Sequence, residues 1–271
     1  MLFRLRQQEG TQARPALAAA SLLAKKLAAG VQVAGLDARV AKHGNFGVNL
    51  AEAQQSAEIF CGAALQLGLI AVVFLTDASL PFQPFVGRGE ALTAVAKVVS
   101  GTIENEWLED HARMCLDMSK IVESHALPRT RTNEPHVQRV GIASAMSANL
   151  RAQGSSSMEL EAYVSHIESQ NRQQICATEN GFVHYNLQMI RDLLLALTKT
   201  ASRGMHTTDR VGEYPDVAGI RLLCHPEREV RRGEIVLELR GSTTTTDPSG
   251  LFSIRSMSAG APNTIEEVVT Q

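Results

Sequence analysis

The sequence predicts an α/β fold, in which a partial parallel-sheet domain is followed by a smaller α+β domain. Residues 21–47 have the pattern of a helix, a strand and a polar turn, and a second helix begins near Asn49. Residues 69–75 are rich in β-formers and carry no charge, which is typical of a central parallel strand. After Gly181 the long helical segments give way to short strands.

These patterns assign elements along the whole chain. Helices are predicted at residues 17–29, 50–67, 90–99, 103–125, 137–152, 158–174 and 187–200. Strands are predicted at residues 33–40, 69–75, 182–184, 220–224, 234–239 and 251–254, with a hairpin turn at 231–233. The predicted organisation is a loose N-terminus at 1–14, an α/β domain at 15–176 that is mainly helical over 103–176, an α+β domain at 177–256 and a poorly ordered tail at 257–271. A polar segment at 128–135 is predicted to be a flexible linker.

Composition excludes several functional classes. The chain has 271 residues and a formal net charge of -2, so it lacks the basic field expected of a nucleic-acid-binding protein. Its four cysteines are scattered without C-x-x-C spacing, which favours reduced thiols in a cytoplasmic protein and argues against structural zinc. We expect no membrane span, because no apolar run is long enough, and no secretory signal in the first ten residues.

Ser21 and Lys25 are candidate binding residues on the first helix. They are four residues apart and therefore share a helix face. A hydroxyl beside an ammonium suits a carbonyl group or an anionic leaving group. The alternative is that Lys25 and Lys26 are solvated surface lysines, since lysine is a good helix former that is mostly exposed.

A second group of candidates follows the first predicted strand. Asp37, Lys42, His43 and Asn45 lie at or near its carboxyl end, where ligands bind in parallel sheets. Lys42 and His43 precede a glycine, so a cation and backbone N–H groups can converge on an anion there. The alternative is a polar loop that caps the strand.

Two further candidates follow the second predicted strand. Asp77 ends that strand and faces the same crevice in one interpretation, or caps a turn in the other. Arg88 lies in a loop between two glycines, where it either contacts a phosphate or is solvated.

Several motifs resemble those of the thymidine and pyrimidine-nucleoside phosphorylases. Residues 21–30 and 36–40 are similar to that family's S-x-x-S-K-K-x-A-x-G…D-V-K-V segment, and residues 75–87 are similar to L-T-D-M-x-Q-P-x-x-x-x-V-G. Residues 87–89, Gly-Arg-Gly, match the related archaeal-type AMP phosphorylases. Weaker matches occur at 181–183, 217–220 and 230–234, so the resemblance spans about residues 13–255, with its specificity in 19–47 and 75–90.

The resemblance implies a pentosyltransferase that cleaves a pyrimidine nucleoside with inorganic phosphate, giving free base and pentose 1-phosphate without a cofactor. It implies that Lys25 stabilises the departing base as the catalytic residue and that Ser21 orients the ring. Lys42, His43, Asp77 and Arg88 are then the other substrate-binding candidates. A homodimer is expected, with no nucleic acid and no membrane as partner. No potassium ion is expected, because Ala91 stands where relatives with a metal site have glutamate.

The sequence also departs from the family. The turn after the first strand, K-H-G-N, differs from the family's G-S-G-A-F and is similar instead to a substrate loop of anthranilate phosphoribosyltransferase. The family's N-terminal helical domain, K-H-S phosphate motif and base-contacting arginine have no counterpart in residues 1–20. We therefore expect poor catalysis from this chain alone. An AMP phosphorylase-type enzyme and a non-catalytic binding or assembly homologue are the alternatives.

Overall fold

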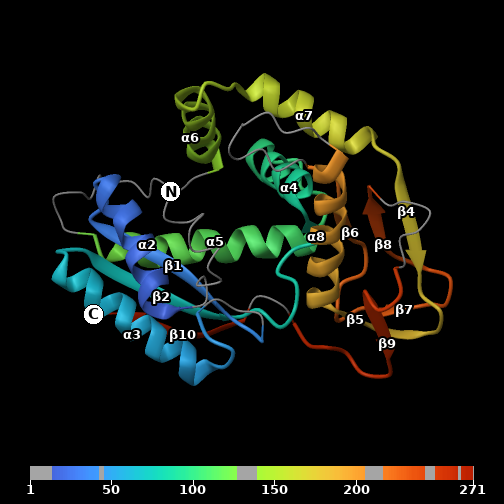
Figure 1. The fold of residues 1–271 in the computed structure, drawn as a ribbon, viewed down its shortest axis with the longest axis horizontal. Helices are drawn as coiled ribbons and strands as arrows, with labels where there is room; N and C mark the ends of the chain where they lie inside the picture. Colours follow the sequence, from blue (N-terminus) through green and yellow to red (C-terminus); the bar gives the residue numbers. More distant parts are fainter. Residues whose placement is uncertain are drawn as a thin grey trace. The chain divides into compact units, whose positions relative to one another are not determined.

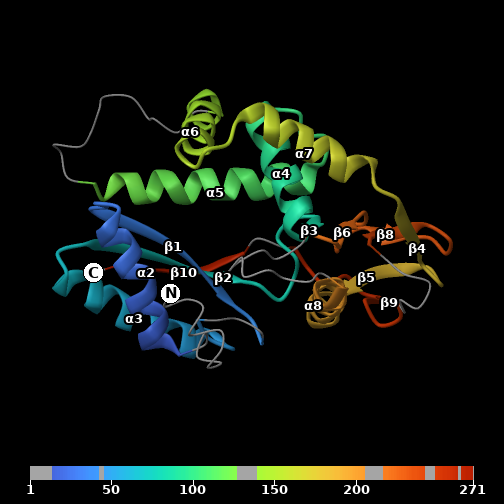
Figure 2. The ribbon, with the colours of Figure 1, turned by 45° about the horizontal axis from the view of Figure 1, so that its top comes forward.

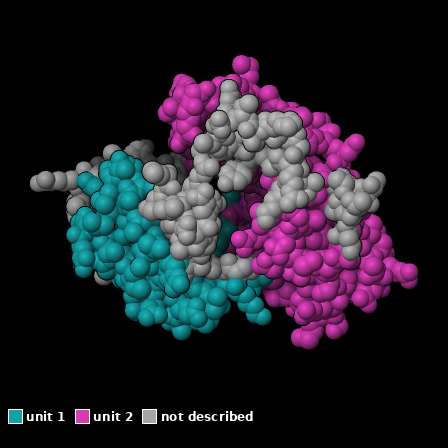
Figure 3. All heavy atoms as spheres, in the orientation of Figure 1, with its two compact units in different colours: residues 1–79, 112–137, 262–271 teal, residues 80–111, 138–261 magenta. Residues whose placement is uncertain are grey.

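The computed structural model describes residues 14–42, 46–126, 139–204, 216–241, 248–261 and 264–270. The chain forms two compact units, coloured separately in Figure 3. Unit 1 comprises Met1–Ser79, Ala112–Val137 and Pro262–Gln271, and unit 2 comprises Leu80–His111 and Gln138–Ala261. Helix α5 (Glu106–Ser124) belongs to both, because its first residues lie in unit 2 and the rest in unit 1.

Unit 1 is built on a three-stranded sheet with the order β1-β2-β10 (Figure 1). Its elements are α2 (Pro15–Ala28), β1 (Val33–Val40), α3 (Leu50–Gln66), β2 (Ile70–Asp77) and β10 (Ile265–Thr270). Strands β1 and β2 are parallel and in register from Val33 opposite Ile70 to Val40 opposite Asp77, whereas β10 is antiparallel to β2. The α/β class and the parallel strand pair are thus confirmed.

The central strand β2 is buried on both faces, which explains its lack of charge. Its residues Ala71, Val73 and Leu75 belong to the same core cluster as side chains of α2 and α3. The alternate residues Val72 and Phe74 pack against α5, which lies along the other face in Figure 2. Successive side chains of β2 therefore pack alternately against α2 and α3 on one face of the sheet and against α5 on the other.

Local sequence signals account for the helix ends in unit 1. Pro15 occupies the first turn of α2, where its missing N–H costs nothing. Asn49 caps α3, because its side chain accepts a hydrogen bond from the Glu52 backbone N–H at 2.9 Å.

Unit 2 combines helices with two antiparallel sheets. The first sheet has the order β3-β6-β8-β4 and the second has the order β7-β5-β9. The strands are β3 (Phe85–Val86), β4 (Arg172–Cys176), β5 (Gly181–Tyr185), β6 (Gly219–Leu222), β7 (Glu229–Val230), β8 (Ile235–Arg240) and β9 (Phe252–Arg255). Besides the start of α5, its helices are α4 (Arg88–Ser100), α6 (Arg139–Ala152), α7 (Ser157–Ser169) and α8 (Leu187–Gly204). Leu222, Leu237 and Leu239 are fully buried in its core, together with Tyr185.

Three sequence expectations are corrected here. The predicted helix at 158–174 ends at Ser169, and β4 begins at Arg172. The predicted hairpin at 231–233 is wrong, because β7 pairs with β5 whereas β8 pairs with β4 and β6. The predicted tail contains β10, whose pairing with β2 joins residues almost 200 positions apart and leaves no local signal.

The compact units also differ from the expected boundaries at 15–176 and 177–256. Unit 2 already begins at Leu80 and includes β3, α4, α6 and α7. The predicted linker at 128–135 lies outside the described residues. In the part of the chain that the structure describes, none of the helices combines the length and apolar character needed to cross a lipid bilayer.

Candidate functional site

Ser21 and Lys25 differ sharply in exposure although they share a face of α2. Ser21 is 3% exposed and belongs to the buried side of the helix, whereas Lys25 is exposed in its last turn. The backbone N–H of Val31 donates to the Lys26 carbonyl at 3.0 Å, so the end of α2 adjoins the start of β1. Lys25, in the last turn of α2, is therefore near the edge of the sheet where β1 begins.

Lys42 and Asp77 lie at the opposite, carboxyl edge of the same sheet. Lys42 is exposed two residues beyond Val40, and Val40 is paired with Asp77 at the end of β2. The Asp77 carboxylate accepts hydrogen bonds from the Ser79 backbone N–H at 2.8 Å and the Ser79 hydroxyl at 2.9 Å. These two bonds are those of an aspartate that caps a turn.

The remaining candidates belong to the other unit or lie outside the described residues. Arg88 is the exposed first residue of α4 and belongs to unit 2. His43 and Asn45 lie outside the described residues. The structure thus brings Lys42 and Asp77 to neighbouring strand ends and separates them from Lys25.

A polar network near the carboxyl edge contains Asp37, which the sequence analysis named as a candidate, together with Thr76 and Arg39, which it did not. The buried hydroxyl of Thr76 donates to one Asp37 carboxylate oxygen at 2.6 Å, and Arg39 Nε donates to the other at 3.1 Å. Asp37 and Arg39 are two residues apart on β1, so they project from the same face of the sheet. This alternation is the signal that would have added Arg39 to the candidates.

Asp37 also lines a cavity between β1, β2 and α5 in unit 1. The cavity measures about 340 Å³, and its walls are Gly35, Leu36, Asp37, Phe74, Cys115, Met118, Ser119 and Val122. Burial raises the pKa of the Cys115 thiol, and the nearby Asp37 carboxylate raises it further, although the Arg39 charge opposes this. The thiol is therefore a neutral wall residue near pH 7, beside one carboxylate and several apolar side chains.

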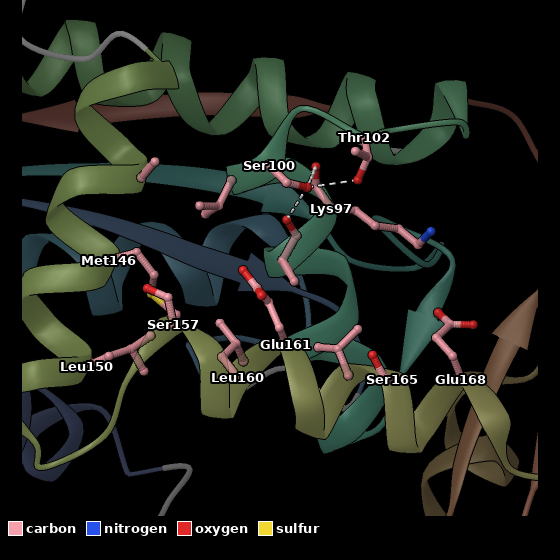
Figure 4. Close-up of a pocket in the computed structure, with 14 residues that line it drawn as sticks. Lys97, Ser100, Thr102, Met146, Leu150, Ser157, Leu160, Glu161, Ser165 and Glu168 are labelled. Atoms are coloured by element: carbon pink, nitrogen blue, oxygen red, sulfur yellow. Dashed lines mark hydrogen bonds between the residues drawn. The ribbon is translucent and has the colours of Figure 1, made fainter.

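Two other cavities lie within unit 2. One measures about 630 Å³ and lies between α4, α6 and α7, with the Glu161 carboxylate pointing from α7 into the space (Figure 4). The Ser100 hydroxyl at its wall is already bonded to the Ala96 carbonyl and to Thr102, both at 2.8 Å. The other measures about 450 Å³ and is lined mainly by acidic residues and by Trp107 and His225. None of the described candidate residues lines either cavity.

Unit 2 also contains a buried cluster of four charged groups. Glu90 Oε1 accepts hydrogen bonds from Arg240 Nε at 2.8 Å and from Arg172 Nη1 at 3.1 Å. Arg240 Nη2 also donates to Asp216 Oδ1 at 3.0 Å, and the Tyr163 hydroxyl donates to Asp216 Oδ2 at 2.5 Å.

The pKa values of this cluster reflect its pairing. Burial alone would raise the pKa of Glu90, but the hydrogen bond and charge of Arg240, a backbone hydrogen bond and the hydrogen bond from Arg172 hold it below its usual value. Burial, the hydrogen bond to Asp216 and the Asp216 charge raise the pKa of Tyr163 to about 12. Because two carboxylates balance two guanidinium groups, we interpret the cluster as scaffold rather than as a ligand site.

Comparisons with known proteins gave no match from which a function could be assigned. No known family model matches the chain, and no curated protein matches it. Among the described residues, no group of three or more His, Cys, Asp or Glu side chains is placed to hold a metal ion.

Proposed function

We propose that this protein is a nucleoside phosphorylase-like pentosyltransferase of the cytoplasm, acting on thymidine or another pyrimidine nucleoside. A phosphate oxygen would attack C1′ of the pentose, and the bond from C1′ to the base nitrogen would break. The base would leave with the electron pair and then take up a proton, giving free base and pentose 1-phosphate. The reaction needs a stabilised leaving base and a positioned phosphate.

One observation carries the proposal. The two segments that resemble phosphorylase motifs most specifically include neighbouring parallel strands, with Val40 paired to Asp77 at their carboxyl ends. Lys42 follows the first of these ends and is exposed, so a cation is available at the edge where parallel sheets bind ligands. In this proposal Lys42 binds phosphate. The resemblance assigns the base to Lys25, but Lys25 lies at the opposite edge of the sheet, so one substrate molecule does not reach both lysines. The Gly-Arg-Gly sequence at 87–89 is what favours AMP as the alternative substrate.

The test is phosphorolysis by the purified chain. It is incubated with phosphate and thymidine, uridine or AMP, and free base is followed by chromatography, with phosphate omitted as control. We expect slow base release that requires phosphate. Lys42→Ala should lower kcat/KM by about 10-fold to 150-fold, because a hydrogen bond to a charged group contributes about 1.5–3 kcal/mol. Lys25→Ala, at the opposite edge of the sheet, should retain the rate.

The burial of Ser21 favours a second candidate, a binding homologue without catalysis. A side chain that is 3% exposed is poorly placed to orient a nucleobase. This alternative predicts no base release from any of the three substrates, and that result would refute the phosphorolysis proposal. Release of adenine alone would instead support the AMP-type activity.

A further inference from the structure

We propose that the cavity between β1, β2 and α5 binds a single neutral heterocyclic ring that carries N–H donors, with Asp37 as its acceptor. This site is on the opposite face of the sheet from α2, and is therefore distinct from the base site assigned to Lys25. The inference rests on the proposed function only for the choice of a pyrimidine base as probe.

The size and walls of the cavity favour one small ring. Its volume of about 340 Å³ is at the lower end of the range for small-molecule sites. Phe74, Met118 and Val122 supply apolar surface from β2 and α5. A Cβ on Gly35 would lie 2.5 Å from Val122 Cγ2, so the absence of a side chain at Gly35 allows α5 to lie close against β1.

The polar groups specify which atoms the ring must present. An ionised carboxylate accepts hydrogen bonds only, and each of its oxygens can accept more than the single bond that Thr76 or Arg39 makes to it in Asp37. Asp37 therefore selects an N–H or O–H donor. Because Arg39 lies 3.1 Å from Asp37 and offsets its charge, a neutral donor is favoured over an organic cation. Uracil and thymine have this chemistry, since both are planar, neutral and carry ring N–H groups.

Alkylation of Cys115 can report whether the cavity is occupied. Cys115 lines the cavity and is exposed, so a ring bound there would shield its thiol from alkylation. Cys176 is also exposed but belongs to β4 in unit 2, which makes it an internal reference. Cys61 and Cys224 are buried and should react slowly in either state.

The experiment measures the iodoacetamide reaction rates of Cys115 and Cys176 by peptide mass spectrometry, with and without uracil. We expect saturable slowing at Cys115 of at least 5-fold and no change at Cys176. 1,3-Dimethyluracil, which lacks both N–H donors, should protect at least 10-fold less well. Equal protection by the two compounds, or none by uracil, would overturn the proposal.

Variants separate this site from the proposed catalytic one. Asp37→Asn should weaken protection by at least 10-fold, whereas Asp117→Asn, the same change at an exposed position of α5, should not. Ser119→Phe is the second variant, which fills the cavity from an exposed helix position and should abolish protection without altering Asp37.

The last arm uses Lys25→Ala. Protection of Cys115 that persists in this variant supports the proposal, even if the chain shows no phosphorolysis. Protection that disappears in this variant would show that the effect on Cys115 depends on α2 and not on a ring bound in the cavity, and would overturn the proposal, whatever the turnover.

Discussion

Strand β2 in unit 1 and strand β8 in unit 2 are both buried, but only β8 buries a charge. The interior of β2, from Ala71 to Thr76, contains no ionisable group. Strand β8 ends in Arg240, whose side chain is 1% exposed and bonded to Glu90 and Asp216. Arg240 is also paired across the sheet with Arg172, so two like charges lie next to each other.

The comparison shows two kinds of core with different tolerances. The stabilisation from apolar burial depends on buried area and packing. Replacing one side chain by a smaller one therefore loses only the contacts of the removed atoms and leaves a cavity. A buried ion cluster depends on every member, because removing one partner leaves the other charge uncompensated. Glu90 is the critical member, since its Oε1 accepts hydrogen bonds from both Arg240 and Arg172.

The largest effect should come from Glu90→Gln. Loss of the negative charge removes the carboxylate that the buried Arg240 and Arg172 share, and we expect a loss of about 3–5 kcal/mol in the free energy of unfolding. Amide hydrogen exchange should speed up at Leu237 and Leu239 of β8. The exposed carboxylate Glu161, changed to Gln, is the control. An unfolding free energy within about 0.5 kcal/mol of wild type would show that the cluster is dispensable.

Leu75→Ala tests the apolar core of unit 1. Leu75 is fully buried in β2, and the substitution should cost about 2–5 kcal/mol through lost burial and a new cavity. Exchange should speed up at Val73 of the same strand and not at Leu237. Leu65→Ala on α3, where the side chain is 64% exposed, should change stability by less than about 0.5 kcal/mol. Equal costs at the two positions would contradict the assigned core.

The pH dependence should distinguish the units, with an effect smaller than either core substitution. The pKa of Glu90 is lower in the folded protein than its usual value of 4.5, so the unfolded chain binds the proton more readily. This stabilisation is present above pH 4.5 and is lost as the pH falls through the folded pKa. Acid titration followed by exchange at Leu239 should show it, and Glu90→Gln should flatten the profile. An unchanged acid profile in that variant would rule out Glu90 as the group responsible.

The smallest effect should come from Asn49→Ala at the start of α3. The substitution removes the side-chain bond to the Glu52 N–H and should cost about 1 kcal/mol, measured by urea unfolding. Asn49→Asp keeps an acceptor at the cap and should restore most of that loss. If both variants behave alike, the cap contributes nothing to stability.

Much of unit 1 was predictable because its signals are local. Asn49 marks a helix start, the uncharged run through Leu75 marks a buried strand, and a helix that connects two strands favours a parallel pair. The same reasoning placed Lys42 and Asp77 at strand ends. It did not foresee the burial of Ser21, because helical spacing identifies a shared face but not which side chains of that face become buried.

The sequence by itself determined the α/β class, the βαβ pairing and the approximate bounds of most helices, since periodicity and capping act within a few residues. The tertiary structure alone decided the pairing of β10 with β2, the ion cluster around Glu90 and the cavity beside Asp37. Each of these depends on contacts between residues far apart in the chain: Glu90 and Arg240 are 150 positions apart. No local pattern encodes such a contact, because its free energy exists only once both segments are in place.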